Sequence, residues 1–338
     1  MKPALILTSL LIVLTSLSCK HSTEPEPQPG RRDYTWTVDT IETPIFNFFT
    51  GIWGSSPDNV FIVGDLGDTY DRIRHFDGNK WSVIMKQPIY SMNDVWGAYP
   101  NSVWFAGNDA YIQYYDGNNL SYYYKHPVKN NQSSLLFELN GTAYNNVYAV
   151  GLTFDHYNSQ NYKGLILHFN GIEWKQILET NFRVQFNKIE FKDKEPIIVG
   201  EKTTNGYPDT TIVYSFKNNS LKEITRGHIR VNIGKIRNDL VVVIDKNLYK
   251  YIDNKLTEFI TIPIKDFSGG LWGRNEKDIF LTSPGKIYHY NGLNFEIVYD
   301  FKNANIHFSD AIIFEKDIFI ICNDIISSKV YILRGKLN

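Results

Sequence analysis

The chain has 338 residues, a formal net charge of −1 at pH 7 and two cysteines. Nucleic-acid binding needs a concentrated footprint of lysine and arginine, and no basic stripe stands out here. We therefore do not expect nucleic acid as a partner.

Residues 1–18 have the features of an export signal. Lys2 supplies the positive start, and the apolar run 4–17 is too short to span a bilayer comfortably. The run ends at Ser16-Leu17-Ser18-Cys19, which resembles a bacterial lipoprotein signal in which the cysteine carries the lipid. Ser16 departs from that pattern, which prefers leucine, and ordinary secretion with a free Cys19 is the alternative. We expect export and lipid anchoring in the bacterial envelope, at the outer membrane.

Residues 19–33 are expected to form a flexible tether. They include Glu24-Pro25-Glu26-Pro27-Gln28-Pro29-Gly30, and alternating prolines without apolar residues cannot build a core. With Cys19 lipidated, Cys322 has no partner for a disulfide, so packing alone must stabilise the fold. Because Cys322 follows the apolar run 318–321, we expect it to be a small buried hydrophobe.

The rest of the chain repeats one unit about seven times. Clear copies are Trp53-Gly54-(x)4-Asn59-Val60-Phe61-Ile62-Val63-Gly64 and Trp96-Gly97-(x)4-Ser102-Val103-Trp104-Phe105-Ala106-Gly107. A third copy, residues 140–151, has lost the tryptophan. The ends of corresponding apolar runs lie 39 to 49 residues apart. A repeat of this length cannot bury its own apolar face, so its copies must stack.

Each unit reads as four β-strands. The second strand is a continuous apolar run such as 60–63, as expected for a strand covered on both faces. The third ends in a hairpin turn, for example Asp77-Gly78 or Asn170-Gly171, whose residues tolerate positive φ. Trp81 and Trp174 open outer strands. Four strands per unit is the blade pattern of a β-propeller.

The two ends of the repeat region complement each other. The seventh unit has no room for a fourth strand after residues 330–333, whereas residues 34–38 form a strand without a unit of their own. We therefore predict that residues 34–38 complete the last blade. Residues 34–338 are expected to form an all-β, seven-bladed propeller of four-stranded antiparallel blades, closed in this way so that no edge is left unpaired.

Recurring histidines and tryptophans are interpreted as packing residues. His75, His168 and His289 occupy the same third-strand position, so repeat symmetry favours a structural role. No cysteine or carboxylate cluster lies near the other histidines at the spacing of metal ligands, and no catalytic elbow or phosphate loop is present. We predict no metal, no cofactor and no catalytic residue.

The repeat resembles a known group of proteins. The unit Trp-Gly-(x)4-[Asp/Asn]-Val-[Phe/Trp]-x-Val-Gly, followed by Tyr/Phe-Asp-Gly, is similar to repeats in exported bacterial propellers of the WG type. Some of these are labelled glucosyltransferase-like without a recognisable transferase site. The resemblance implies a fold and an exported location, and it transfers no catalytic residue.

Variable connections point to a binding face. The connections from second to third strands, expected at 65–72, 154–164 and 201–211, are expanded, and the connection 125–133 opens onto the same face. Variable loops on a rigid scaffold commonly carry recognition. The candidate ligand-binding residues are Asp65, Asp68, Tyr70, His126, Asp155, His156, Tyr157, Tyr162, Tyr207 and Asp209.

A second set of candidates lies near the starts of first strands, which line the central channel. These are Asp94, Glu138, Asn187 and Asp310. The leading hypothesis is a non-enzymatic module that binds a glycan or an envelope protein through the variable face. A scaffold role in an envelope complex stands beside it. The alternative is a glycoside-active enzyme that uses carboxylates such as Asp94 and Glu138 at the channel mouth.

Overall fold

The computed structural model describes residues 28–42, 48–65, 73–84, 91–129, 131–204, 207–228, 231–237 and 239–338. For residues 65, 159, 160, 204, 207 and 208 it describes the backbone alone. The predicted signal peptide, Cys19, Asp68 and Tyr70 lie outside these ranges. The described part of the chain forms 28 β-strands, and it contains no helix that is long and apolar enough to cross a membrane.

Most strands belong to four-stranded antiparallel sheets, each named here by its strands. The first sheet consists of β2 (Phe48–Ser56), β3 (Asn59–Asp65), β4 (Ile73–Phe76) and β5 (Trp81–Val83). The second consists of β6 (Met92–Tyr99), β7 (Ser102–Gly107), β8 (Tyr111–Tyr115) and β9 (Leu120–Lys125). The third consists of β10 (Gln132–Ala143), β11 (Asn146–Asp155), β12 (Asn158–Phe169) and β13 (Trp174–Glu179). The next is β14 (Gln185–Lys192), β15 (Glu195–Thr204), β16 (Tyr207–Lys217) and β17 (Ser220–Gly227).

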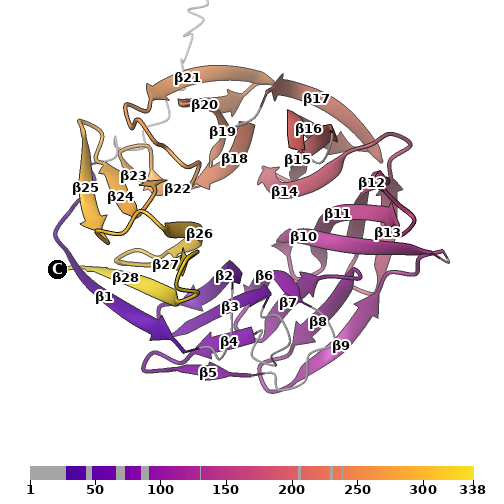
Figure 1. Ribbon diagram of the computed structural model, residues 1–338, viewed down its shortest axis with the longest axis horizontal. Helices are drawn as coiled ribbons and strands as arrows, with labels where there is room; N and C mark the ends of the chain where they lie inside the picture. The colour runs from indigo at the N-terminus through magenta and orange to yellow at the C-terminus, as the bar shows by residue number, and fades with distance from the viewer. Residues whose placement is uncertain are drawn as a thin grey trace, which may run out of the picture.

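The next eight strands form one sheet made of two such units. They are β18 (Val231–Ile236), β19 (Asp239–Ile244), β20 (Asn247–Ile252), β21 (Lys255–Thr261), β22 (Leu271–Asn275), β23 (Asp278–Ser283), β24 (Lys286–Tyr290) and β25 (Phe295–Asp300). A single parallel pair, Ile236 with Gly273, joins its halves. Figure 1 shows the units arranged around a central opening, with the first strand of each unit innermost.

The last sheet combines both ends of the repeat region. It has the order β1-β28-β27-β26, where β1 is Tyr34–Ile41, β26 is Ile306–Ile313, β27 is Asp317–Asp324 and β28 is Val330–Leu337. β1 runs antiparallel to β28 from the pair Tyr34 and Leu337 to the pair Ile41 and Val330. The N-terminal strand therefore occupies the outer position that residues 34–38 were predicted to take.

Trp-Gly pairs hold neighbouring units together. Trp53 of β2 lies over Gly97 of β6, and a Cβ atom on Gly97 would stand 2.7 Å from the indole. Trp96 meets Gly141 of β10 in the same way. The tryptophan thus fills space that the glycine of the next unit leaves free. The apolar core is divided accordingly, because clusters such as Trp104, Ala106, Leu139 and Val147 lie between two units.

The predicted hairpin turns have the predicted backbone. Gly78, Gly117, Gly171 and Gly292 have φ between +90° and +98°, a region in which a side chain is strained. In the weaker copies, both residues of Asn218-Asn219 and of Asp253-Asn254 have positive φ. The Asp77 carboxylate accepts hydrogen bonds from the backbone N–H groups of Asn79 and Lys80, which fixes the turn.

The two faces of the ring differ. We call the face with the second-to-third-strand connections the insertion face, and the face with the first-to-second and third-to-fourth connections the hairpin face. The prediction that 154–164 and 201–211 are loops is wrong. The strands β11 and β12 are paired as far as Asp155 and Asn158, and the strands β15 and β16 are paired as far as Thr204 and Tyr207. Cross-strand pairing continues past the repeat unit, so these segments are long two-stranded arms.

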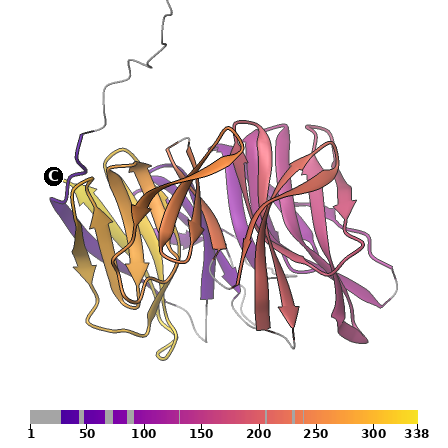
Figure 2. The same cartoon turned by 90° about the horizontal axis from the view of Figure 1, so that it is seen from above.

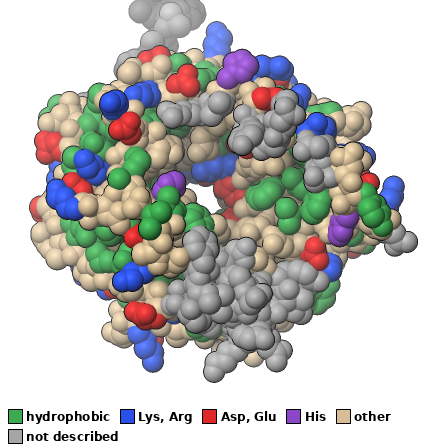
Figure 3. All heavy atoms as spheres, viewed as in Figure 1, with side chains coloured by type: hydrophobic (Ala, Val, Ile, Leu, Met, Phe, Trp, Pro, Cys, Tyr) green, Lys and Arg blue, Asp and Glu red, His purple; other side chains and the backbone are tan. Residues whose placement is uncertain are grey.

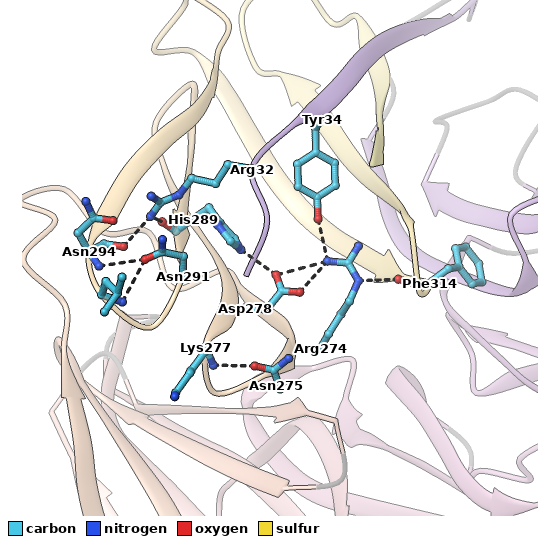
Figure 4. Close-up of polar contacts among 11 residues, drawn as sticks. Arg32, Tyr34, Arg274, Asn275, Lys277, Asp278, His289, Asn291, Asn294 and Phe314 are labelled. Atoms are coloured by element: carbon cyan, nitrogen blue, oxygen red, sulfur yellow. Dashed lines mark hydrogen bonds and ion pairs between the residues drawn. The ribbon is translucent and has the colours of Figure 1, made fainter. Parts of the chain in front are cut away.

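The segment before β1 is fixed to the hairpin face. Gly30 N–H donates to the carbonyl of Lys277, and the Arg32 guanidinium donates to the carbonyls of His289 and Asn294. Figure 4 shows this contact beside the bonds from Arg274 to the Tyr34 hydroxyl and to Asp278. Gly30 and Arg32, which were predicted to belong to the tether, are therefore held by the β22–β25 unit. Figure 2 shows the described N-terminal residues and the C-terminus on the same side of the ring.

Candidate binding pocket at the channel mouth

The recurring histidines have the structural role that repeat symmetry predicted. Nε2 of His75 lies 2.6 Å from Oδ1 of Asn59, and His168 and Asn146 repeat the contact at 2.8 Å. The same rings stack on the aromatic residue two positions after the asparagine, for example His75 on Phe61 with ring centroids 4.4 Å apart. This explains the [Asp/Asn]-Val-[Phe/Trp] pattern, since both ends of it contact the histidine.

The β22–β25 unit carries an ionisable version of this pair. His289 is fully buried, and its Nε2 lies 2.7 Å from Oδ1 of Asp278. Burial raises the pKa of Asp278, but the hydrogen bonds from His289 and Arg274 outweigh it and leave the pKa below its ordinary value. Arg274 also donates to the carbonyl of Phe314 and to the Tyr34 hydroxyl. The group therefore ties three segments of the chain together.

Carboxylates on the channel wall link successive units. Asp94 accepts a hydrogen bond of 2.7 Å from the backbone N–H of Leu139, which belongs to the next unit. Glu138 accepts one of 3.1 Å from Ile189. Asp310 accepts one of 3.3 Å from Ile52, across the junction between the chain's last and first units. Three of the four predicted channel residues are thus structural links in the described structure.

Burial raises the pKa of each of these carboxyl groups. The pKa of Asp94 rises to about 8, that of Asp310 to about 6, and that of Glu138 well above its ordinary value. One ammonium lies among them. Burial lowers the pKa of Lys188, but the neighbouring carboxylates, Glu138 first, raise it overall. Figure 3 shows acidic and basic side chains on the wall of the central opening.

A pocket opens beside this group. It has a volume of about 440 Å³ and lies where β14, β15, β18 and β19 meet the connection between β21 and β22. A smaller pocket of about 190 Å³ continues along the channel to Trp272 and Asp310. Lys188, Asn232 and Ser268 line both. We call the two together the channel-mouth pocket. Asp245 stands at the connection between β19 and β20, and Glu201 lies in the insertion-face half of β15, so the pocket opens on the insertion face.

The predicted insertion-face residues do not form one cluster. Tyr157 is 83% exposed at the tip of the β11–β12 arm, where its N–H donates to Asp155. His156 is exposed beside it and its Nε2 lies 2.5 Å from the hydroxyl of Ser133. The prediction that Tyr162 lies on the surface is wrong. It is buried because β12 carries it into the interior, where its hydroxyl contacts Thr203 at 2.8 Å.

The other predicted insertion-face residues are scattered. His126 is also buried, and its ring lies 3.4 Å from the Tyr124 hydroxyl, so it is not available to a ligand. Asp209 is half-buried on β16, and its carbonyl contacts His228. Asp65 ends β3 and Tyr207 opens β16, both at the insertion face. Among the predicted residues that the structure describes, Asp155, His156 and Tyr157 stand side by side.

Sequence reasoning found part of the pocket. Asn187 and Asp310 line it, whereas Lys188, Glu201, Asn232 and Asp245 were not among the predicted residues. The repeat contained a signal for Lys188, because it pairs with Val199 as Asp94 pairs with Ala106 and Glu138 with Val150. A bulge before each of these residues shifts the register by one position, which the spacing does not reveal.

No group of three or more His, Cys, Asp or Glu side chains within the described ranges is arranged to hold a metal ion. Cys322 is buried and unpaired, as its apolar neighbours predicted. Burial raises the pKa of its thiol, so it is a packing residue.

The comparisons with known proteins concern the fold. YCF48 from Cyanidioschyzon merolae matches with a TM-score of 0.61 and 13% identity, over 88% of this chain and 98% of that one. YCF48 bound to D1 peptide gives 0.60 and 13%, over 92% and 100%. The chain has a β-propeller fold. An oligogalacturonate lyase in complex with manganese gives 0.60 and 10%, over 92% and 99%.

A further match is the β-propeller domain of Cps50 (Swd1) from Myceliophteria thermophila, with a TM-score of 0.57 and 7% identity over 88% of this propeller and 99% of that chain. No protein-family model matches the sequence, and no curated protein matches it. At these identities, the similarity supports the propeller fold and transfers no activity.

Proposed function

We propose that this is a seven-bladed propeller, closed by β1, that is exported and lipid-anchored through Cys19 and acts as a recognition module of the cell envelope. Four strands for each blade account for the 28 strands of the described residues, with the eight-stranded sheet counted as two blades. The pairing of β1 with β28 supports the closure. Recognition through the insertion face follows from where the channel-mouth pocket opens.

The channel-mouth pocket is the observation on which this function rests. Its wall of Val199, Val231, Val243 and Phe267 is mainly aliphatic, and a few polar groups converge on it. Pockets of this composition suit a ligand that has both apolar and polar parts. The larger pocket offers one aromatic ring, Phe267, and the smaller one adds Trp272 and Phe308. A protein segment is the partner we propose, because a similar propeller has been solved with a peptide bound.

The wall carboxylates give the glycoside-active alternative less support. Asp94 and Glu138 each use an oxygen to accept a backbone N–H of the next blade. A pair of acids that cleaves glycosides needs carboxyl groups free to reach the scissile bond.

Site-specific photo-crosslinking in intact cells tests the proposal. We expect a crosslinker at Lys246, which follows Asp245 on the rim of the pocket, to capture a defined envelope protein. A crosslinker at Leu293, which is 79% exposed on the hairpin face, is the matched control. Capture of the same protein from both positions, or only from Leu293, would show that the insertion face is not the recognition face.

A further inference from the structure

The pocket's lining has an apolar part and a polar part, which together define a ligand. Val199, Val231, Val243 and Phe267 are all buried, with 3% to 5% of each residue exposed. They form a wall of the larger pocket, whose volume of about 440 Å³ accommodates one long side chain. An aliphatic chain on this wall gains free energy from each methylene group that it withdraws from water.

Acidic groups stand at the same pocket. Glu201 lies in the insertion-face half of β15, and Asp245 follows β19 directly. Burial raises the pKa of Glu201, which hydrogen bonds from Asn187 and Gln185 partly oppose. A carboxyl group that is partly withdrawn from water gains from a cation that approaches it.

An unsatisfied acceptor provides a second, independent indication. Oδ1 of Asn187 is buried and accepts no hydrogen bond from the described residues. Asn187 lines the pocket, and buried polar atoms are nearly always paired, so a donor on a ligand would give this acceptor a partner. A ligand that presents an N–H or O–H group suits it.

The ammonium of Lys188 does not make the pocket electrostatically unfavourable for a second cation. Four carboxyl groups act on it, from Glu138, Glu190, Asp310 and Asp94. Asp310 has a pKa of about 6 and is ionised at neutral pH, so its charge offsets that of the ammonium along the channel wall. Glu201 and Asp245 remain for an incoming cation, with one acidic group on each of two neighbouring blades.

We infer that the channel-mouth pocket binds a lysine or arginine side chain of the partner segment, with its aliphatic stem on the valine wall and its charged head between Glu201, Asp245 and Asn187. The inference rests on the proposed recognition function and adds the chemistry of the residue that is recognised. Arginine suits it best, because a guanidinium presents several donors in a fixed plane.

The test compares small probes on the detergent-solubilised full-length protein by titration calorimetry. The probes are Nα-acetyl-arginine methylamide and its uncharged counterparts, the citrulline and norleucine derivatives. We expect the arginine probe to bind at least fivefold more tightly than either. Equal binding of charged and uncharged probes would overturn the inference.

Substitutions locate the effect. Glu201→Gln with Asp245→Asn should lower the affinity for the arginine probe at least tenfold and leave that for the norleucine probe unchanged. The matched control, Glu195→Gln with Asp253→Asn, removes the same charges beside a pocket on the hairpin face and should change neither. An equal loss in the control would mean that net charge, not this site, attracts the probe.

Single substitution at Asp245 keeps the test valid if the double variant does not fold. Asp245 has φ of 54°, which asparagine tolerates, so Asp245→Asn should fold and should weaken arginine binding severalfold.

Spermidine provides the last comparison, and tighter binding of spermidine than of the arginine probe would overturn a peptide side chain as the ligand. If crosslinking at Lys246 captures a partner while the probes show no preference for charge, this inference fails and the recognition function stands.

Discussion

Gly97 lies directly beneath the indole of Trp53, and this contact explains why tryptophan and glycine recur together. A Cβ atom at residue 97 would stand 2.7 Å from two carbons of the indole, closer than packed atoms approach. We expect Gly97→Ala to lower the free energy of unfolding by about 1–3 kcal/mol, as overpacking does. Urea denaturation measures this. Trp53→Phe removes the offending carbons, so the double variant should lose less than the sum of the two single variants.

Asp94 gives the protein a defined pH dependence. Its pKa is about 8 in the folded protein and 3.8 ordinarily, so the folded state holds the proton more tightly. Stability is then fully present below pH 4 and is lost as the pH rises through 8. We expect the melting temperature to fall between pH 5 and pH 8, and to fall less in Asp94→Asn, whose amide resembles the neutral acid. A steeper fall in that variant would contradict the assignment.

At the scale of elements, β1 is held to the neighbouring β2–β5 blade by one carboxylate. Asp39 accepts hydrogen bonds of 3.0 Å from the indole of Trp81 and of 3.0 Å from Arg334. We expect Asp39→Ala to lower the free energy of unfolding by about 1–3 kcal/mol, because both donors lose their acceptor. Hydrogen exchange should accelerate in β1 before the other strands.

Asp33→Ala is the matched control for the change at Asp39. Asp33 is exposed and its carboxylate pairs with Arg31 two residues away, so its removal should leave exchange in β1 unchanged. Uniform acceleration across all blades in Asp39→Ala would mean that this carboxylate stabilises the whole ring and not the junction.

The repeat predicted most of the elements because each strand and turn has its own local signal. The Asp-Gly and Asn-Gly turns, the apolar second strands and the histidine position all follow from side-chain chemistry within one unit. The arms of β11–β12 and β15–β16 did not, because their length depends on cross-strand pairing outside the unit. Tyr162 was misplaced for the same reason, since a residue in a strand points inward or outward according to its register.

The site was harder to predict than the elements. The place near the start of a strand predicts Asn187 as a channel residue, whereas Lys188 occupies the position equivalent to Asp94. Ser268 belongs to the connection before β22, outside any repeated strand. Pockets between blades combine residues from separate units, and the spacing within one unit carries no information about such combinations.

At the scale of the whole molecule, the contact of Gly30 and Arg32 with the hairpin face fixes where the chain enters the propeller. Cys19 precedes Gly30 by eleven residues (30 − 19), which at roughly 3.5 Å per residue reach at most about 40 Å. With Cys19 acylated, the hairpin face should lie toward the bilayer. We expect a fluorophore at Leu293→Cys to transfer more energy to a lipid-bound acceptor than one at Tyr157→Cys, since both positions are exposed and Cys322 is buried.

Cys19→Ala separates the two parts of that expectation. It should release the protein from the membrane fraction, and the energy transfer from both positions should then disappear. Equal transfer from both positions in the acylated protein would show that the contact does not orient the ring. An acyl chain that attaches the propeller on its hairpin side would leave the insertion-face end of the channel facing away from the membrane. The anchor itself would then determine the direction from which a partner can dock.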